Sequence, residues 1–301
     1  MSKTTQEILT QPECWRRAAA LAGDPRVAGC LPPPGAELAV IGCGTSWFVA
    51  QAYTAAREAA GHGRSDPFTA SEYPRSRTYP WVLAISRSGT TSEVEALLRE
   101  LPGDTTSTVI TGVDDSPCVR AARHRVLLDF ADEESVVQTR FATSALALLR
   151  AALGHDVAAA AADAERALTM PLPLDAGAVE QVSFLGTGWT IGLANEAALK
   201  CREAAQLWTE SYPAMEYRHG PISIAQAGRG VWPFGPLPPG LADQVRATGA
   251  ALVDTGDLDA LAARVLAQRF AVAAAESRGR DPDKPRNLTR SVILSSSEVT
   301  S

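Results

Sequence analysis

Short apolar runs alternate with longer helix-like segments along most of the chain. The runs that predict buried strands are 38–41, 81–85, 107–110, 126–128 and 182–185. The segments that predict helices after these runs are 46–60, 91–101 and 191–207. Short buried strands joined by helical crossovers are typical of parallel sheets. We therefore expect an α/β fold.

Proline-rich breaks divide this pattern. A helix is predicted over 5–22, with a bend near Pro12, and the run Pro32-Pro33-Pro34-Gly35 lies beyond its end. A long Ala-rich helix is predicted over 136–168, and Pro171-Leu172-Pro173 ends it. The expected organisation is a helical segment at 1–36, a first subdomain at 37–170, a second at 171–280 and a tail at 281–301.

The two predicted subdomains repeat one pattern. Gly42-Cys43-Gly44 and Gly186-Thr187-Gly188 stand 144 positions apart, and Arg57-Glu58-Ala59-Ala60 is echoed by Arg202-Glu203-Ala204-Ala205. Self-similarity at a fixed spacing indicates a duplicated unit. We expect two pseudo-repeated, doubly wound parallel-sheet subdomains, with ligand sites at the carboxyl ends of their strands.

Three loops rich in Gly, Ser and Thr follow predicted strands and open predicted helices. They are Gly42-Cys43-Gly44-Thr45-Ser46, Ser86-Arg87-Ser88-Gly89-Thr90-Thr91 and Gly186-Thr187-Gly188-Trp189-Thr190. Such a loop directs backbone N–H groups, hydroxyl donors and the positive end of a helix dipole toward one point. The anion expected there is a phosphate ester.

The composition argues against several classes of partner and bound group. The net charge of -6 over 301 residues argues against a nucleic-acid partner, which normally meets a basic face. No apolar stretch suits a membrane span or a signal peptide, so a cytoplasmic protein without membrane contact is expected. The five cysteines form no C-x-x-C pair and the four histidines show no helical spacing. We predict reduced thiols, no metal and no cofactor.

Several charged or nucleophilic residues are candidates for chemistry. Glu196, Lys200 and Glu203 stand at i, i+4 and i+7 of a predicted helix and share one face. That face can carry proton transfers, or it can be a surface ion-pair ladder, which most such spacings are. His219 precedes Gly220-Pro221, which predicts an imidazole exposed at a turn. Cys43, at a predicted helix start, is either a thiol of lowered pKa or a small packing residue.

Six segments together resemble the sugar isomerase (SIS) family. They are Cys43-Gly44-Thr45-Ser46, Ser86-Arg87-Ser88-Gly89-Thr90-Thr91, Val136-Val137-Gln138-Thr139-Arg140, Glu196-Ala197-Ala198-Leu199-Lys200-Cys201-Arg202-Glu203, Tyr217-Arg218-His219-Gly220-Pro221 and Asp283-Lys284-Pro285-Arg286-Asn287-Leu288-Thr289-Arg290-Ser291-Val292. In order, they are similar to the isomerase half of glucosamine-6-phosphate synthase and to its stand-alone deaminase or isomerase relatives. The resemblance covers about 37–292 and is weak over 226–281. It implies two flavodoxin-like SIS subdomains, without the synthase's glutaminase half.

The resemblance implies a phosphate site in the first subdomain. The residues that hold the phosphate in this interpretation are Thr45, Ser46, Ser86, Ser88 and Thr91. Arg87 stands where the family more often has glutamine, and an arginine adds a charge-assisted contact that glutamine lacks. The alternative for Arg87 is a solvated loop residue. The other residues expected to bind substrate are Cys43, Gly44, Glu133, Val136 and Glu196.

The resemblance also implies catalytic roles. Glu203 is expected to move the proton at carbon 2 of the sugar, and Lys200 to orient the phosphate or neighbouring hydroxyls. His219 is expected to open the sugar ring, a step suited to a group that titrates near neutrality. In relatives this histidine reaches the site of the neighbouring subunit, which implies a homodimer or a larger assembly.

The C-terminal tail departs from the family pattern. The synthase tail supplies a lysine that can form a Schiff base with the keto sugar, and the matching residue here is Arg290. Arginine can stabilise an oxyanion or a phosphate, but it cannot form an imine. Lys284 is either a substitute from a re-routed tail or a partner of Asp281 or Asp283. The tail is expected to close over the active site.

Three functions remain open at this point. The first is an isomerase or deaminase that abstracts the proton at carbon 2 of glucosamine 6-phosphate or N-acetylglucosamine 6-phosphate. The second is a lyase or dehydratase that expels water or an ether substituent from carbon 3 of N-acetylglucosamine 6-phosphate. The third is a sugar-phosphate sensor, which has no need of Glu203 and His219 together. The sugar epimer and the state of its nitrogen also stay open.

Overall fold

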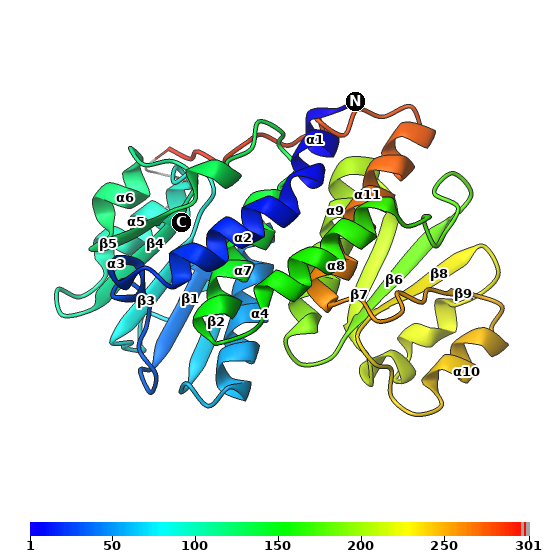
Figure 1. Cartoon of the computed structure of the whole chain (residues 1–301), viewed down its shortest axis with the longest axis horizontal. Coiled ribbons are helices and arrows are strands. Elements are labelled where there is room, and N and C mark those ends of the chain that lie inside the picture. Colours follow the sequence, from blue (N-terminus) through cyan, green and yellow to red (C-terminus); the bar gives the residue numbers. More distant parts are fainter. Residues whose placement is uncertain (296–297, 299–301) are drawn as a thin grey trace. The chain divides into compact units, whose positions relative to one another are not determined.

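The computed structural model describes residues 1–295 and 298. They divide into two compact units, each built around one parallel sheet (Figure 1). The first-sheet unit comprises Glu13–Glu133, Arg140–Val157 and the described residues from Thr289 onward. The second-sheet unit comprises Met1–Pro12, Glu134–Thr139 and Ala158–Leu288.

These boundaries differ from the predicted ones because two additional helical segments pack within the second-sheet unit. α1 (Lys3–Leu9) packs against α11 (Ala260–Ser277). On α8 (Val157–Thr169), Arg166 forms an ion pair with Asp257 at 3.0 Å. Arg269 on α11 donates a hydrogen bond to the carbonyl oxygen of Ala167 at 2.7 Å. Side-chain contacts, rather than the proline break after α8, thus set this boundary.

The first sheet has five parallel strands in the order β2-β1-β3-β4-β5. They are β1 (Leu38–Gly42), β2 (Ser65–Thr69), β3 (Trp81–Ile85), β4 (Thr106–Thr111) and β5 (His124–Leu127). The helices α2 (Gln11–Ala22) and α3 (Pro25–Ala28) precede them, and α4 (Thr45–Ala59), α5 (Ser92–Glu100), α6 (Pro117–Ala121) and α7 (Arg140–Ala152) follow strands of the sheet. Every residue of β1 is buried, as expected for a central strand covered on both faces.

The second sheet repeats this topology with four parallel strands in the order β7-β6-β8-β9. They are β6 (Gln181–Gly186), β7 (Trp208–Pro213), β8 (Arg229–Phe234) and β9 (Ala251–Leu252), with helices α9 (Thr190–Ala205) and α10 (Leu241–Ala247) between them. The order corresponds strand for strand to β2-β1-β3-β4. The predicted class of two pseudo-repeated α/β parallel sheets is confirmed.

The repeat extends to the backbone of the two strand-to-helix loops. A Cβ added at Gly42 would lie 2.7 Å from the backbone of Ser46, and one at Gly186 would lie 2.4 Å from the backbone of Thr190. Gly44 and Gly188 both adopt positive φ, at 55° and 57°. Each helix therefore begins too close to the end of its strand for any side chain other than hydrogen.

Two predicted helices are interrupted. The segment 5–22 forms α1 and α2 instead of one bent helix, because Pro12 occupies the first turn of α2, where its missing N–H is tolerated. The Ala-rich stretch forms α7 and α8, with Gly154 between them at φ 85°. The strands and α-helices without a predicted counterpart are β2, β7, β8, β9, α3, α6, α10 and α11.

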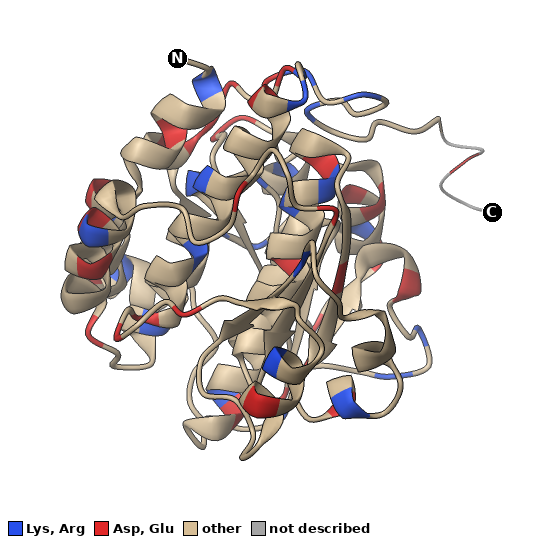
Figure 2. Cartoon of the chain, turned by 90° about the vertical axis from the view of Figure 1, so that its right-hand side faces the viewer, with Lys and Arg blue, Asp and Glu red and all other residues tan. Residues whose placement is uncertain are grey.

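The described part of the chain contains no helix with the length and apolarity needed to cross a membrane. Figure 2 shows Lys and Arg interspersed with Asp and Glu over the helices and loops of the visible face.

Candidate active site

Two of the three Gly-, Ser- and Thr-rich loops meet at the carboxyl end of the first sheet. β1 lies between β2 and β3, so the strand order reverses there. The loops after β1 and β3, at 42–46 and 86–91, flank this switch point, where doubly wound sheets bind ligands. Four of the predicted phosphate ligands are buried, namely Thr45, Ser46, Ser86 and Ser88, whereas Thr91 and Cys43 are half-buried and Gly44 is exposed.

The start of α4 adds backbone donors at the same place. Gly44 is the N-cap of this helix and provides no side-chain cap, so the positive end of the helix dipole is available to an anion, although the N–H groups of Ser46 and Trp47 also donate to backbone carbonyls. The hydroxyl oxygens of Ser86 and Thr91 lie 3.5 Å apart across the second loop. The geometry suits a small oxyanion held by hydroxyl and amide donors.

Arg87 is buried, so its interpretation as a solvated loop residue is wrong. Its side chain is 1% exposed, and Nη1 lies 3.9 Å from Oε2 of Glu133. Nη2 donates to the carbonyl oxygen of Arg290 at 2.8 Å. Oε1 of Glu133 in turn accepts from the N–H of Arg140 at 2.8 Å. The structure thus brings three predicted site residues, Arg87, Glu133 and Arg290, into one polar cluster.

The side chain of Arg290 is held by a residue that the sequence pattern did not single out. Nη2 of Arg290 donates to both carboxylate oxygens of Asp132, at 2.6 and 2.8 Å. Both side chains are about one-third exposed. An acidic residue in a polar loop carries no distinguishing sequence signal, and only the fold places Asp132 beside the tail.

Further contacts fix the tail along the second loop. Oγ1 of Thr90 donates to Oγ of Ser291 at 3.0 Å, and the N–H of Ser92 donates to the carbonyl oxygen of Val292 at 3.3 Å.

Closer to the start of the tail, Asp283 accepts from the N–H and hydroxyl of Thr4 at 2.8 and 2.7 Å. Asp283 thus contacts α1, and the pairing of Lys284 with Asp281 or Asp283 stays a prediction.

Glu196, Lys200 and Glu203 form a largely buried charge cluster on α9. Nζ of Lys200 forms an ion pair with Oε2 of Glu203 and lies 3.9 Å from Oε1 of Glu196. The side chains of Lys200 and Glu196 are 1% and 5% exposed, which excludes a surface ion-pair ladder. Glu203 keeps 19% of its side chain exposed. The fourth member is Arg264 of α11, whose guanidinium forms an ion pair with Oε2 of Glu196.

Glu203 lies far from the third loop of the second-sheet unit. It stands five residues before Trp208, whose register partner Gln181 begins β6, so Glu203 is near the amino end of the sheet. Thr190 starts α9 at the opposite end, about 20 Å from Glu203 at about 1.5 Å of rise per residue. The Thr190 hydroxyl donates a hydrogen bond of 2.7 Å to the carbonyl oxygen of Phe234. This bond ties the third loop to the end of β8, the strand beside β6.

His219 lies in the second-sheet unit on an exposed turn. It follows a short 3-10 helix, Glu216–Arg218, and its N–H donates to the carbonyl oxygen of Glu216 at 2.9 Å. Gly220 has φ 122°, a conformation that favours glycine and turns the chain sharply after His219. The imidazole is accessible to solvent, as the turn motif predicts.

The predicted site residues are divided between the two units. The first-sheet unit holds Cys43, Gly44, Thr45, Ser46, Ser86, Arg87, Ser88, Thr91, Glu133 and Arg290. The second-sheet unit holds Val136, Glu196, Lys200, Glu203 and His219. Val136 is half-buried in the short segment Glu134–Thr139, where the neighbouring Ser135 donates to Glu7 of α1.

The thiol of Cys43 is not an activated nucleophile. Burial raises the pKa of its thiol to about 11, which excludes the interpretation of a thiol activated by the start of α4. The side chain packs against the core that contains Ala39, Ile41 and Val94. Within residues 1–295 and 298, no three His, Cys, Asp or Glu side chains are arranged to hold a metal ion.

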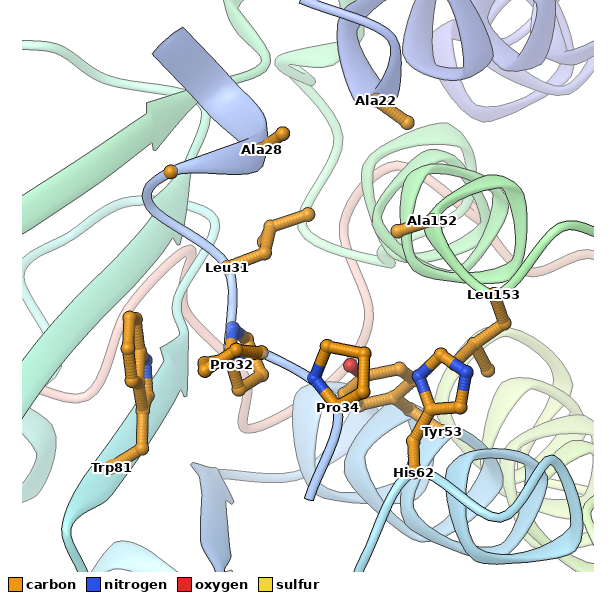
Figure 3. Close-up of a pocket in the computed structure, with 12 residues that line it drawn as sticks. Ala22, Ala28, Leu31, Pro32, Pro34, Tyr53, His62, Trp81, Ala152 and Leu153 are labelled. Atoms are coloured by element: carbon orange, nitrogen blue, oxygen red, sulfur yellow. The ribbon is translucent and has the colours of Figure 1, made fainter. Parts of the chain in front are cut away.

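A cavity of about 450 Å³ in the first-sheet unit lies away from the loops (Figure 3). Its lining includes Trp81, the first residue of β3, together with Pro32, Pro34, Tyr53 and His62. Trp81 marks the amino end of the first sheet, whereas the phosphate loops follow the carboxyl ends. This largely apolar cavity is therefore separate from the candidate active site.

Two curated proteins similar to the chain carry the same description. The glutamine–fructose-6-phosphate aminotransferase [isomerizing] of Sulfurisphaera tokodaii is 28% identical over 292 residues, covering 85% of this chain and 49% of that protein. The one of Sulfolobus acidocaldarius is 28% identical over 299 residues, covering 86% of this chain and 50% of that protein. The chain thus spans about half the length of these relatives. No family model matches the chain.

Solved structures agree on the fold. Glucosamine-6-phosphate deaminase from Thermotoga maritima superposes with a TM-score of 0.83 at 22% identity, covering 97% of this chain and 100% of that chain. Tagatose-6-phosphate ketose/aldose isomerase from Escherichia coli gives 0.79 at 19% identity, with 98% and 96% covered. The resemblance predicted from the six motifs is therefore confirmed: the relatives of this chain are isomerizing glutamine–fructose-6-phosphate aminotransferases, and its fold is that of phosphosugar isomerases.

Proposed function

We propose that the chain is a phosphosugar isomerase that moves a proton at carbon 2 of an amino-sugar 6-phosphate, with isomerisation or deamination as the outcome. The observation that carries the proposal is the ion pair between buried Lys200 and partly exposed Glu203. The ammonium group of Lys200 fixes one oxygen of the Glu203 carboxylate, and part of the Glu203 side chain stays exposed. A carboxylate held in this way is arranged to accept a proton from a ligand.

The comparisons support the class of substrate. Relatives named as isomerizing fructose-6-phosphate aminotransferases and neighbours named as a glucosamine-6-phosphate deaminase and a tagatose-6-phosphate isomerase all act on hexose 6-phosphates by name. The loops at 42–46 and 86–91, with the N-terminus of α4, supply the donors that a phosphate monoester requires. Cys43, Gly44, Glu133, Val136 and Glu196 complete the proposed substrate-binding set.

The proposed reaction begins when His219 moves a proton from the anomeric hydroxyl to the ring oxygen, which opens the sugar. Glu203 then removes the proton at carbon 2, and the C–H electron pair forms a double bond to carbon 1 while the carbonyl oxygen takes up a proton. Glu203 returns the proton to carbon 1, and the group on carbon 2 loses one proton as its double bond to carbon 2 forms. Where that group is a free amine, the product is an imine, which water hydrolyses to the ketose and ammonia.

The first experiment follows deuterium at carbon 2 by NMR in heavy water. Purified protein is incubated separately with glucosamine 6-phosphate and N-acetylglucosamine 6-phosphate, with assays for ammonia and for ultraviolet absorbance. We expect exchange by the wild type and a loss of about a thousandfold or more in Glu203→Gln, as for removal of an acid–base group. Glu276→Gln removes an exposed carboxylate of α11 in the same unit and is expected to retain activity.

The outcomes separate the alternative functions. Exchange with ammonia and a ketose supports the isomerase or deaminase. An unsaturated sugar formed without ammonia would instead establish elimination at carbon 3. Tight binding of a sugar phosphate without exchange would establish a sensor and contradict the proposal.

We further propose that the protein acts as a homodimer in which His219 serves the site of the neighbouring subunit. The exposed position of His219 on a sharp turn supports this arrangement. Mixing Glu203→Gln with His219→Asn subunits would then restore one intact site in each mixed dimer, or about a quarter of wild-type activity on random exchange. If each subunit completes its own site, the mixture stays inactive.

A further inference from the structure

Arg264 is a buried cation in an otherwise apolar stretch of helix. It is the fifth residue of α11, between the buried Leu261 and Phe270, and its side chain is 1% exposed. α11 and α9 lie side by side within the second-sheet unit (Figure 1). Burial lowers the pKa of the guanidinium to about 9, which still leaves it charged at neutral pH. An arginine in a helix core requires a compensating anion, and Glu196 provides it.

The charges of the cluster balance only when Arg264 is included. Two carboxylates, Glu196 and Glu203, face the single ammonium group of Lys200 along α9. Nζ of Lys200 contacts Glu203 directly but remains 3.9 Å from Glu196. Without Arg264, the carboxylate of Glu196 would be buried with no close cation, a costly state. Lys200 would then be drawn from Glu203 toward Glu196.

Resting on the proposed role of Glu203 as the base, we propose that Arg264 is a positioning residue: it holds the carboxylate of Glu196, so that the Lys200 ammonium stays on Glu203. Arg264 reaches Glu203 only through Glu196 and Lys200. Its contribution is therefore to the orientation of the base and not to contact with the sugar. The proposal adds α11, which the six motifs leave out, to the elements that shape the catalytic cluster.

The test is a double-mutant cycle of Arg264→Met, Glu196→Gln and both together, with kcat and KM measured for carbon 2 exchange. We expect Arg264→Met alone to lower kcat by about tenfold or more with little change in KM, since coupled charges in one network are non-additive. In the Glu196→Gln background, where no carboxylate remains to be held, Arg264→Met is expected to change kcat less than about twofold. A loss of the same factor in both backgrounds would overturn the proposal and assign Arg264 a packing role.

Arg269→Met is the matched control. Arg269 lies on the same helix, but its guanidinium binds the carbonyl oxygens of Ala167 and Met170, both at 2.7 Å, outside the cluster. It is expected to leave kcat unchanged. If Arg264→Met alone does not fold, Arg264→Lys in the two backgrounds replaces it, because lysine keeps the charge but loses the forked geometry.

A crystal structure of the Arg264→Met protein tests the same inference without turnover. We expect Nζ of Lys200 to move from Glu203 to Glu196, and to remain on Glu203 in the double variant. Lys200 unmoved in the single variant would contradict the inference even if the enzyme is active. Conversely, absence of exchange by the wild type with either sugar would contradict the proposed function while leaving the predicted movement of Lys200 measurable.

Discussion

Nη2 of Arg87 donates a hydrogen bond of 2.8 Å to the carbonyl oxygen of Arg290, so a side chain of the second loop holds the backbone of the C-terminal tail. Asp132 holds the side chain of the same tail residue. The tail is thus tied to the first-sheet unit through both its backbone and its side chain. Arg87 combines this contact with a place in the proposed phosphate loop.

Replacing Arg87 by glutamine is expected to loosen the tail. Glutamine is shorter and uncharged, so the hydrogen bond to Arg290 is lost, and such charge-assisted bonds contribute about 1.5–3 kcal/mol. Amide hydrogen exchange of residues 289–295 should therefore accelerate by about tenfold or more. Arg99→Gln is the control, because Arg99 is an exposed arginine paired with Glu95 on α5. Unchanged exchange in the tail of Arg87→Gln would show that the other contacts suffice to hold it.

Replacing Arg290 by lysine is expected to introduce an amine that can form an imine at the tail. Arginine remains protonated and cannot form one, so wild-type protein treated with fructose 6-phosphate and borohydride should gain no sugar on its tail peptide. The Arg290→Lys protein should gain one, as detected by mass spectrometry. Arg286→Lys, at an exposed tail position, serves as the control for non-specific trapping. Labelling of Lys284 in the wild type would instead support a re-routed tail.

Much of the fold follows from the sequence because buried strands and glycine loops leave strong signals. β1, β3 and β6 are apolar and central, and the strand predicted at 81–85 matches β3 (Trp81–Ile85). The edge strands β2 and β7 have no counterpart in the sequence prediction because many of their residues are only half-buried. Their sequences also contain a proline and an acidic residue, which are rare in strands. α11 was missed although it is strongly apolar, since the motif resemblance is weakest there.

The candidate site was predictable only where its residues lie in motifs. The spacing of Glu196, Lys200 and Glu203 placed them on one face of a helix, but it could not distinguish a buried cluster from a surface ladder. That distinction depends on α11, which covers the face and contributes Arg264. Likewise, Asp132 meets Arg290 across 158 residues of sequence, a separation that no local pattern encodes.

Alanine at Gly42 or Gly186 is expected to destabilise the protein by about 1–3 kcal/mol, because each added Cβ must push apart a packed backbone. The nearest backbone atoms would lie 2.7 Å away at Gly42 and 2.4 Å away at Gly186. The larger effect is expected at Gly186, where the approach is closer. Urea unfolding of both variants checks this, with Gly103→Ala as the control, since a Cβ there meets nothing within 4 Å. Equal stability of the three variants would show that both helices can shift without cost.

The buried thiol of Cys201 predicts a loss of stability at alkaline pH. Burial raises its pKa to about 12, so the native state keeps the proton while the unfolded chain releases it above about pH 9. The contribution of the thiol is therefore complete below pH 9 and decreases as the pH rises toward 12. At pH 10.5 the loss amounts to about 2 kcal/mol, at about 1.4 kcal/mol per pKa unit.

Cys201→Ala removes this titration, so its free energy of unfolding should fall less steeply than that of the wild type between pH 8 and 10.5. Other groups titrate in the same range, but they are common to both proteins and cancel in the difference. Val231→Ala, which also removes buried volume from the second-sheet unit but carries no thiol, should differ from the wild type by the same amount at both pH values. A difference between wild type and Cys201→Ala that stays constant with pH would mean that the Cys201 thiolate is accommodated in the native core.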